Sequence, residues 1–242
     1  AVDRHGDLLR LAASCPGNED RLGGNEAPPS IVSVFLGNAL TELLQEMAQG
    51  HALHREAQGE LLMGVKSLPL LKRDDSDRNR TSPFAFTGNK FEFRMVGASQ
   101  SLGLANAVTN AIVADVLREF ADYLEAAPDK HAAVRDLVAK TWQEHGRIVF
   151  NGNNYSEEWH AEALRRGLPD IRGMVDAAES YLKPENIAMF ERMHVFTEAE
   201  CRSRYEITLE TYSKHVHIDA STMLEMVGRS VLPAGYAYLA KV

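Results

Sequence analysis

The chain has 242 residues, of which 45% are hydrophobic, and 26 Lys and Arg against 34 Asp and Glu give a formal net charge of −8. This composition predicts a globular protein and argues against a general binder of nucleic acids or anionic membranes, and no apolar run approaches the roughly 20 residues that span a bilayer. Cys15 and Cys201 lie far apart and indicate neither a disulfide framework nor a zinc site, so we expect a cytoplasmic protein.

The first part of the chain mixes strand and helix signals. We expect a short strand over residues 7–13, then a turn-rich loop, and a buried strand over the β-branched apolar run 31–36. Helical spacing of apolar residues predicts a helix over 41–49, and residues 61–65 are a strand candidate. The mixed-sign run 72–78 (KRDDSDR) is expected to be a solvated surface loop.

The second part of the chain has helical patterns. A long apolar-periodic segment over 102–126 is followed by Pro128 and Asp129, which predict a break before a second helix over 131–145. Four residues are expected near the starts of later helices: Ser156, Pro184, Thr197 and Asp219. The sequence therefore predicts an α+β fold, with a mixed segment over 1–127 and an all-helical segment over 128–242.

One candidate site is the loop RLGGNEAPP, which begins at Arg21. The arginine supplies a permanently charged fork suited to a carboxylate, and Gly23 and Gly24 allow a sharp bend. Glu26 then lies at the tip of the loop, before a stiff Pro-Pro pair. The pattern suggests a hinged flap that carries one carboxylate, or alternatively a surface turn with an incidental ion pair.

The second candidate site is a strand-like alternation near residue 92. Lys90, Glu92 and Arg94 are expected on one face, and Phe91, Phe93 and Met95 are expected on the other. Residues two apart on a strand are about 6.6 Å apart, so Glu92 has a cation on each side, which keeps it ionised as a metal ligand requires. A phosphate between the cations with a divalent ion on Glu92 fits this pattern, and so does a cross-strand ladder of salt bridges.

Two long runs carry a family resemblance. NEAPPSIVSVFLG and DRNRTSPFAFTGNKFEFRMVGASQS resemble the glutamine synthetase family, specifically the type III enzymes of bacteria, and the likeness continues through 150–170 and 204–226. The resemblance implies ATP-dependent ligation of ammonia to glutamate through γ-glutamyl phosphate, a glutamate-ammonia ligase activity that uses Mg²⁺ or Mn²⁺.

The resemblance also assigns roles to the Arg21 loop. Arg21 looks like the family arginine that grips the glutamate substrate, and Glu26 looks like the flap glutamate that shields the acyl phosphate and takes a proton from bound ammonium. This loop is one residue shorter between the arginine and the glutamate than in the commoner types of the family. The resemblance therefore supports the identities of these residues more firmly than the geometry of the flap.

Four more residues acquire roles in the same way. Arg80 resembles an arginine that contacts the ATP phosphates, and Lys90 occupies another basic position on the phosphate side. Glu92 resembles a metal ligand on the nucleotide side, and Arg94 resembles the arginine that holds the substrate carboxylate and the transferred phosphoryl group. Many family members have a further arginine where this chain has Ala85.

The resemblance implies a fold and an assembly as well. Residues 1–127 correspond to the later part of the catalytic sheet or barrel, residues 128–242 correspond to a helical segment typical of type III enzymes, and the whole enzyme is a double-ring homo-dodecamer. Further metal glutamates, a nucleotide-binding histidine motif and a β-grasp domain are expected upstream of Ala1, so we expect a piece of a longer polypeptide that is inactive alone. Two alternatives remain: an inactive synthetase-like regulatory or assembly protein, and a related γ-glutamyl-amine ligase.

Overall fold

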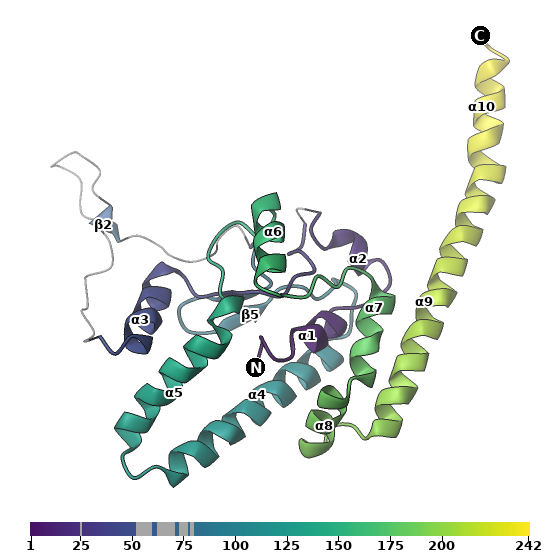
Figure 1. The fold of residues 1–242 in the computed structure, drawn as a ribbon. Coiled ribbons are helices and arrows are strands. Elements are labelled where there is room, and N and C mark those ends of the chain that lie inside the picture. Colours follow the sequence, from purple (N-terminus) through teal and green to yellow (C-terminus); the bar gives the residue numbers. More distant parts are fainter. Residues whose placement is uncertain (25, 52–59, 62–70, 73–76, 78–79) are drawn as a thin grey trace.

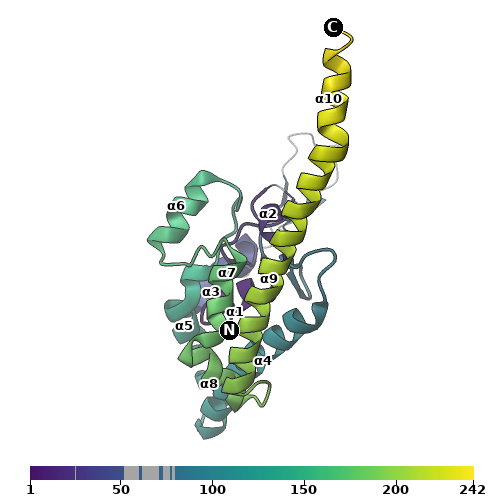
Figure 2. The ribbon, with the colours of Figure 1, turned by 90° about the vertical axis from the view of Figure 1, so that its right-hand side faces the viewer.

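The computed structural model of the protein describes residues 1–24, 26–51, 60–61, 71–72, 77 and 80–242. In this part of the chain, helices surround a small sheet, and a long C-terminal helix projects from the body (Figure 1). The view turned by 90° shows the same projection (Figure 2). The expected α+β class with a helical C-terminal segment is confirmed.

The described residues contain a sheet with the strand order β1-β4-β5. These strands are β1 (Val34–Phe35), β4 (Phe84–Phe86) and β5 (Phe91–Phe93). β1 is parallel to β4, and β4 is antiparallel to β5 with Ala85 opposite Glu92. The buried strand expected over 31–36 is confirmed in its centre, where β1 forms.

A separate antiparallel pair joins β2 (Glu60–Leu61) to β3 (Leu71–Lys72). The strand candidate 61–65 begins in β2, and its remaining residues lie outside the described part of the chain.

The strand expected over 7–13 is wrong, because the structure has helix α1 (Gly6–Ala12) there. Its leucines Leu8, Leu9 and Leu11 are at most 1% exposed, and Arg10 is also 1% exposed. The Arg10 guanidinium donates to two backbone carbonyls, those of residues 171 and 172. A short helix that is buried on all sides has no polar face, so its sequence lacks the helical period that an amphipathic helix displays.

Of the next four helices, the first lies in the segment expected to be a turn-rich loop, and the other three agree closely with the sequence expectations. They are α2 (Asn18–Arg21), α3 (Asn38–Ala48), α4 (Leu102–Ala126) and α5 (Lys130–His145). Asp129 caps α5 by accepting from the backbone N–H groups of residues 131 and 132. α4 and α5 form a helical hairpin that is visible in Figure 1.

The C-terminal part is helical throughout most of its length. It contains α6 (Glu157–Arg165), α7 (Met174–Ala178), α8 (Pro184–Arg192), α9 (Glu198–Met226) and α10 (Leu232–Leu239). Short turns of other helix types lie at η1 (Gly146–Ile148), η2 (Glu179–Leu182) and η3 (Val227–Val231). None of the described helices has the combination of length and hydropathy that crossing a membrane requires.

Three of the four expected helix starts are confirmed. Ser156 accepts from the backbone of residue 159, Pro184 begins α8, and Thr197 forms a capping box with Glu200. Asp219 does not begin a helix, because α9 continues through it. No Gly or Pro interrupts the sequence of α9, so a residue type that favours caps simply stays within the helix.

A small core joins the sheet to the C-terminal part. It combines buried residues of β1 and β4 with residues from the η1 turn and from α6: Ile31, Val34, Phe84, Ile148, Trp159, Ala163 and Leu168. Trp159 also stacks on Phe150 with ring centroids 3.8 Å apart. The strands that carry the candidate site are therefore packed against the later helical segment.

Candidate functional site

The charged face of β5 is arranged as the alternation predicted. Lys90 Nζ lies 3.4 Å from Glu92 Oε1, and Arg94 Nη2 lies 3.0 Å from Glu92 Oε2. The Arg94 Nε also donates to Glu92 Oε2 at 3.1 Å. On the opposite face, the phenylalanine rings form a cluster: Phe84, Phe86, Phe91 and Phe93. The structure thus confirms that the three charged side chains converge.

Two cations hold Glu92 in its ionised form. The hydrogen bond from Arg94, together with the charge of Arg94 and a weaker effect of Lys90, lowers the pKa of Glu92 below the ordinary glutamate value. The residue directly across from Glu92 on β4 is Ala85, which is fully buried. The charges therefore pair along one strand, and the cross-strand ladder considered as an alternative is not the arrangement at this position.

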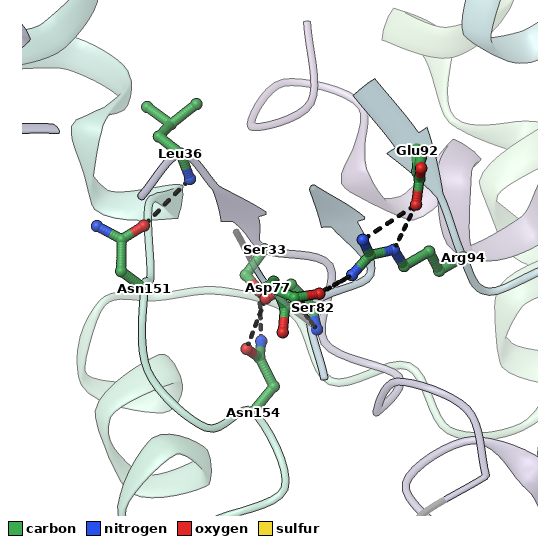
Figure 3. Close-up of polar contacts among 8 residues, drawn as sticks. All are labelled: Ser33, Leu36, Asp77, Ser82, Glu92, Arg94, Asn151 and Asn154. Carbon is green, nitrogen blue, oxygen red and sulfur yellow. Dashed lines mark hydrogen bonds and ion pairs between the residues drawn. The ribbon is translucent and has the colours of Figure 1, made fainter. Parts of the chain in front are cut away.

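Asp77 is a partner of Arg94 that the sequence interpretation missed. Its Oδ2 accepts from Arg94 Nη1 at 3.0 Å, and its backbone carbonyl accepts from the same nitrogen at 3.3 Å (Figure 3). The Asp77 side chain is 7% exposed, so the expected solvated loop over 72–78 is wrong at this residue. Residues 73–76 and 78 of that run lie outside the described residues. An Asp shortly before a turn-forming Ser-Pro pair is a recognisable signal for side-chain bonding to the backbone.

A buried polar chain extends from Asp77 into the C-terminal part of the protein. The Ser82 N–H donates to Asp77 Oδ2 at 2.9 Å, and the Ser82 hydroxyl donates to Asn154 Oδ1 at 3.2 Å. Asn154 Nδ2 in turn donates to Ser33 Oγ at 2.6 Å (Figure 3). Ser33, Ser82 and Asn154 are 0% exposed. This chain fixes the entry to β4 against both β1 and the loop before α6.

Asn151 from the same loop makes a second connection to the end of β1. Its Oδ1 accepts from the N–H groups of Leu36 and Gly37 at 3.1 and 3.0 Å, and its Nδ2 donates to Thr41 Oγ1 at 2.8 Å. Figure 3 shows Asn151 and Asn154 reaching the sheet from one loop. The run FNGNNYS, which carried part of the family resemblance, therefore has a structural role beside the site.

The Arg21 loop forms an ion pair of its own. Arg21 Nε lies 3.3 Å from Glu26 Oε1, and Arg21 Nη1 donates to Asn18 Oδ1 at 2.5 Å. Gly23 has a φ of 80°, a conformation that favours glycine, so the bend expected at the glycine pair is confirmed at this residue. The Glu26 side chain is 69% exposed. An exposed carboxylate thus lies on a bent loop, as a flap requires.

Asn18 connects this loop to the end of β5. Its Nδ2 donates to the carbonyl of Met95 at 2.9 Å and to the carbonyl of Ala13 at 2.6 Å, and the residue is 3% exposed. Because Met95 directly follows Arg94, the two predicted site regions meet through one buried amide.

Arg80 is also brought beside the site, through its backbone. Its N–H donates to the Asp77 carbonyl at 3.4 Å, and the residue is exposed. Arg80 has a φ of 54°, in the left-handed region that costs a non-glycine residue about 1–2 kcal/mol. The exposed Arg80 is therefore bonded through its backbone to the residue that pairs with Arg94.

Glu92 can contribute one oxygen ligand to a divalent metal ion. In the part of the chain that the structure describes, no group of three or more His, Cys, Asp and Glu side chains could hold a metal. Mg²⁺ is commonly bound by one or two carboxylates together with water and substrate phosphate, so Glu92 fits as one member of a larger ligand set.

An apolar cavity of about 980 Å³ lies on the other face of the sheet. Its lining includes Phe84, Phe91 and Phe93 together with residues of α4 and α5, whereas Lys90, Glu92 and Arg94 do not line it. The candidate site is therefore the charged face of β5, where the two cations Lys90 and Arg94 flank Glu92 and Arg94 also pairs with Asp77. This chemistry is suited to a polyanion and a divalent ion.

Comparisons with known proteins find similarity to glutamine synthetases. Residues 133–242 match the family model described as the glutamine synthetase C-terminal domain. The chain is 39% identical over 241 residues to the type-3 glutamine synthetase of Dictyostelium discoideum, which covers 98% of this chain and 33% of that protein. It is 38% identical over 252 residues to a glutamine synthetase of Butyrivibrio fibrisolvens and 36% identical over 244 residues to one of Bacteroides fragilis, covering 98% of this chain and 34% of each relative. The chain thus spans about a third of the length of these relatives.

Proposed function

This chain belongs to the glutamine synthetase family, and we propose that it forms part of an enzyme that ligates ammonia to glutamate with ATP. The observation that carries the proposal is the convergence of Lys90, Glu92 and Arg94 on one face of β5, with the Arg21 loop tethered to the same strand. This arrangement offers cations to phosphate and carboxylate groups and one carboxylate to a metal ion.

We assign the roles of the site residues from the family resemblance. Arg21 and Arg94 bind the glutamate substrate, and Arg94 also faces the transferred phosphoryl group. Arg80 and Lys90 bind the ATP phosphates, and the exposure of both cations is compatible with this role. A guanidinium is suited to these roles because its fork matches carboxylate and phosphate oxygens.

The reaction has two steps. A γ-carboxylate oxygen of glutamate attacks the terminal phosphorus of ATP, the bond to the ADP oxygen breaks, and γ-glutamyl phosphate forms. Glu26 then takes a proton from bound ammonium, and the resulting ammonia attacks the acyl carbon as phosphate leaves. A divalent ion held by Glu92, Mg²⁺ or Mn²⁺, would neutralise phosphate charge. The protein contributes mainly fixed positive charge and positioning, as phosphoryl transfer requires.

Glu92 provides a direct test of the metal assignment in the full-length enzyme. We expect Glu92→Gln to raise the Mg²⁺ concentration needed for half-maximal glutamine formation at least tenfold, because an amide is a weaker ligand than a carboxylate. Glu162→Gln is the matched control, since Arg165 and Arg166 pair with Glu162 in α6 and lower its pKa to about 2. Equal Mg²⁺ dependence of both variants and the wild type would contradict the assignment.

We further propose that the 242-residue chain alone has no ligase activity. Glu92 is one carboxylate, and the described residues supply no cluster that would complete a metal site. The measurement is ATP-dependent glutamine formation by the purified chain, with the full-length enzyme as the positive control. Clear turnover by the chain alone would defeat this expectation. In the cell, we propose a cytoplasmic homo-oligomer with the double-ring form, which mass measurement of the full-length enzyme would test.

A synthetase-like protein without catalysis is the second candidate, and Ala85 favours it. This residue replaces the arginine of many family members and lies fully buried opposite Glu92. Glutamine formation by the full-length protein would exclude this candidate. If ammonia is a poor substrate and a polyamine is a good one, the enzyme is instead a γ-glutamyl-amine ligase.

A further inference from the structure

The strongest constraint on Arg94 comes from Asp77. Arg94 Nη1 donates to both the Oδ2 and the backbone carbonyl of Asp77, at 3.0 and 3.3 Å. The side chains of Asp77 and Arg94 are 7% and 12% exposed, whereas that of Glu92 is 37% exposed. Because water screens the Glu92 contact more strongly, the Asp77 contact determines the orientation of the guanidinium to a greater extent.

Asp77 also bonds to the backbone of Arg80 and of Ser82. Its Oδ2 accepts from the Ser82 N–H at 2.9 Å, and its carbonyl accepts from the Arg80 N–H at 3.4 Å. The carboxylate oxygen that orients Arg94 therefore also accepts from the backbone of Ser82, and Figure 3 shows Asp77 between these two residues. A single residue thus bonds to the Arg94 side chain and to the backbone of Arg80.

Ser82 is itself held in place by buried polar groups. The Ser82 hydroxyl donates to Asn154, and Asn154 donates to Ser33, with all three residues fully buried. Asp77 thus connects Arg94 by hydrogen bonds to groups that are fixed in the core, and functional side chains depend on such supporting contacts for their orientation.

The pairing of Arg94 with Asp77 matters most when Glu92, the proposed metal ligand, binds a metal ion. In the described arrangement, Arg94 occupies Glu92 Oε2, and Lys90 lies beside Oε1. A divalent ion on Glu92 competes with these cations for the carboxylate, which weakens the hold of Glu92 on Arg94. Asp77 faces the opposite side of the guanidinium and keeps its charge partner when the metal is bound.

We propose that Asp77 is a positioning residue that holds Arg94, and the backbone of Arg80, in the geometry for phosphoryl transfer. The inference rests on the proposed function and adds a residue to which the family resemblance gives no role. A displacement of about 1 Å in a group that positions a reacting centre costs on the order of 100-fold in rate. Loss of Asp77 is therefore expected to lower kcat more than it changes binding.

The test compares variants of the full-length enzyme. We expect Asp77→Asn to lower kcat about 10- to 100-fold and to raise the KM values for glutamate and ATP by a smaller factor, below about tenfold, because Arg94 and Arg80 also contact these substrates. Asp77→Glu keeps the charge but lengthens the side chain by one methylene group, and it is expected to lower kcat by a similar factor. Asp115→Asn is the matched control, because Asp115 pairs with Arg192 at 2.7 Å and its side chain is 5% exposed. Its kcat should stay within about twofold of the wild type.

A double-variant comparison separates positioning from a general loss of structure. If Asp77 acts through Arg94, the kcat of D77N/R94K will lie within about threefold of that of R94K alone. If the two losses multiply, or if D77N and D115N lose the same activity per folded enzyme, the inference is wrong. A wild-type enzyme without ligase activity would instead refute the proposed function, and this inference would fall with it.

Discussion

Replacement of Asn154 is expected to destabilise the 242-residue chain more than replacement of its exposed neighbour. Asn154→Ala removes two buried side-chain hydrogen bonds, to Ser33 and Ser82. Each such bond contributes about 0.5–1.5 kcal/mol net, and a buried hydroxyl left without a partner adds about 1–3 kcal/mol. Because the serine hydroxyls can rotate toward other acceptors, we expect a loss of about 2–4 kcal/mol in the free energy of unfolding.

The assay is urea unfolding of the chain, followed by circular dichroism and by the fluorescence of buried Trp159. The midpoint should fall without a change in the slope m, because the surface exposed on unfolding stays the same. Asn153→Ala is the control, since Asn153 is exposed and the contact of its side chain among the described residues is the hydrogen bond that it accepts from the Tyr155 N–H. We expect this control to lose less than about 1 kcal/mol. Equal losses in the two variants would refute the account of the buried chain.

Asn154→Asp extends the same test to charge. The variant places a carboxyl group in a fully buried position, one hydrogen-bonded serine away from Asp77. Burial and the neighbouring carboxylate both disfavour ionisation, so the folded-state pKa of the new group will exceed its unfolded value. Its stability is therefore greatest at low pH and falls as pH rises through the folded-state pKa. At pH 7 this variant should have a lower free energy of unfolding than Asn154→Ala. Near pH 5 the difference between the two variants should become smaller or change sign.

Three further predictions concern other parts of the molecule. In the full-length enzyme, Asn18→Ala should raise the KM for glutamate about tenfold, because Arg21 loses its buried anchor, as a steady-state assay will determine. Asp115→Asn should lower the free energy of unfolding by about 1–3 kcal/mol at pH 7. The hydrogen bonds from Arg192 lower the pKa of Asp115, so the ionised carboxylate stabilises the fold at pH values above the ordinary aspartate pKa. Acid denaturation curves should therefore show the stability difference between variant and wild type vanishing as pH falls through the folded-state pKa. Burial raises the pKa of Tyr181 to about 12, so the stability from its neutral form should be lost only above pH 10, and Tyr181→Phe should remove this late titration from the ultraviolet absorbance.

Local signals explain why most helices were predictable. The segment 102–126 was expected from its periodicity and is α4, and the break at Pro128 and Asp129 separates it from α5. The capping residues Ser156 and Thr197 act within three residues of themselves, so their sequence neighbours suffice to identify them.

The errors arise where tertiary packing decides the structure. Helix α1 is enclosed by other elements, so its apolar residues recur on every side and resemble a buried strand in sequence. Asp219 is a good capping residue by type, but a cap also requires a chain that stops being helical before it. The residues before Asp219 favour no such stop, and α9 passes through.

The candidate site was partly predictable for the same reason. The alternation of Lys90, Glu92 and Arg94 is a property of one strand, and the sequence displays it. Asp77 reaches Arg94 across 17 positions of sequence, from a run whose mixed charges usually indicate a solvated surface. Only the closure of the turn at Ser82 shows that this one carboxylate points inward.

The position of the site also bears on how the chain is divided. A boundary after residue 127 stays a prediction, yet packing and hydrogen bonding cross it: Val34 bridges to Val149, Ile31 bridges to Asp170, and Trp159 shares a core with the first strands. Contacts of this kind make neighbouring elements unfold cooperatively. The buried Asn154 adds a polar contact to Ser82, at the entry to the strand paired with β5. Asn154 of the later segment therefore supports the geometry of Arg94 through Ser82 and Asp77, and its substitution can alter the site without changing any group that binds substrate.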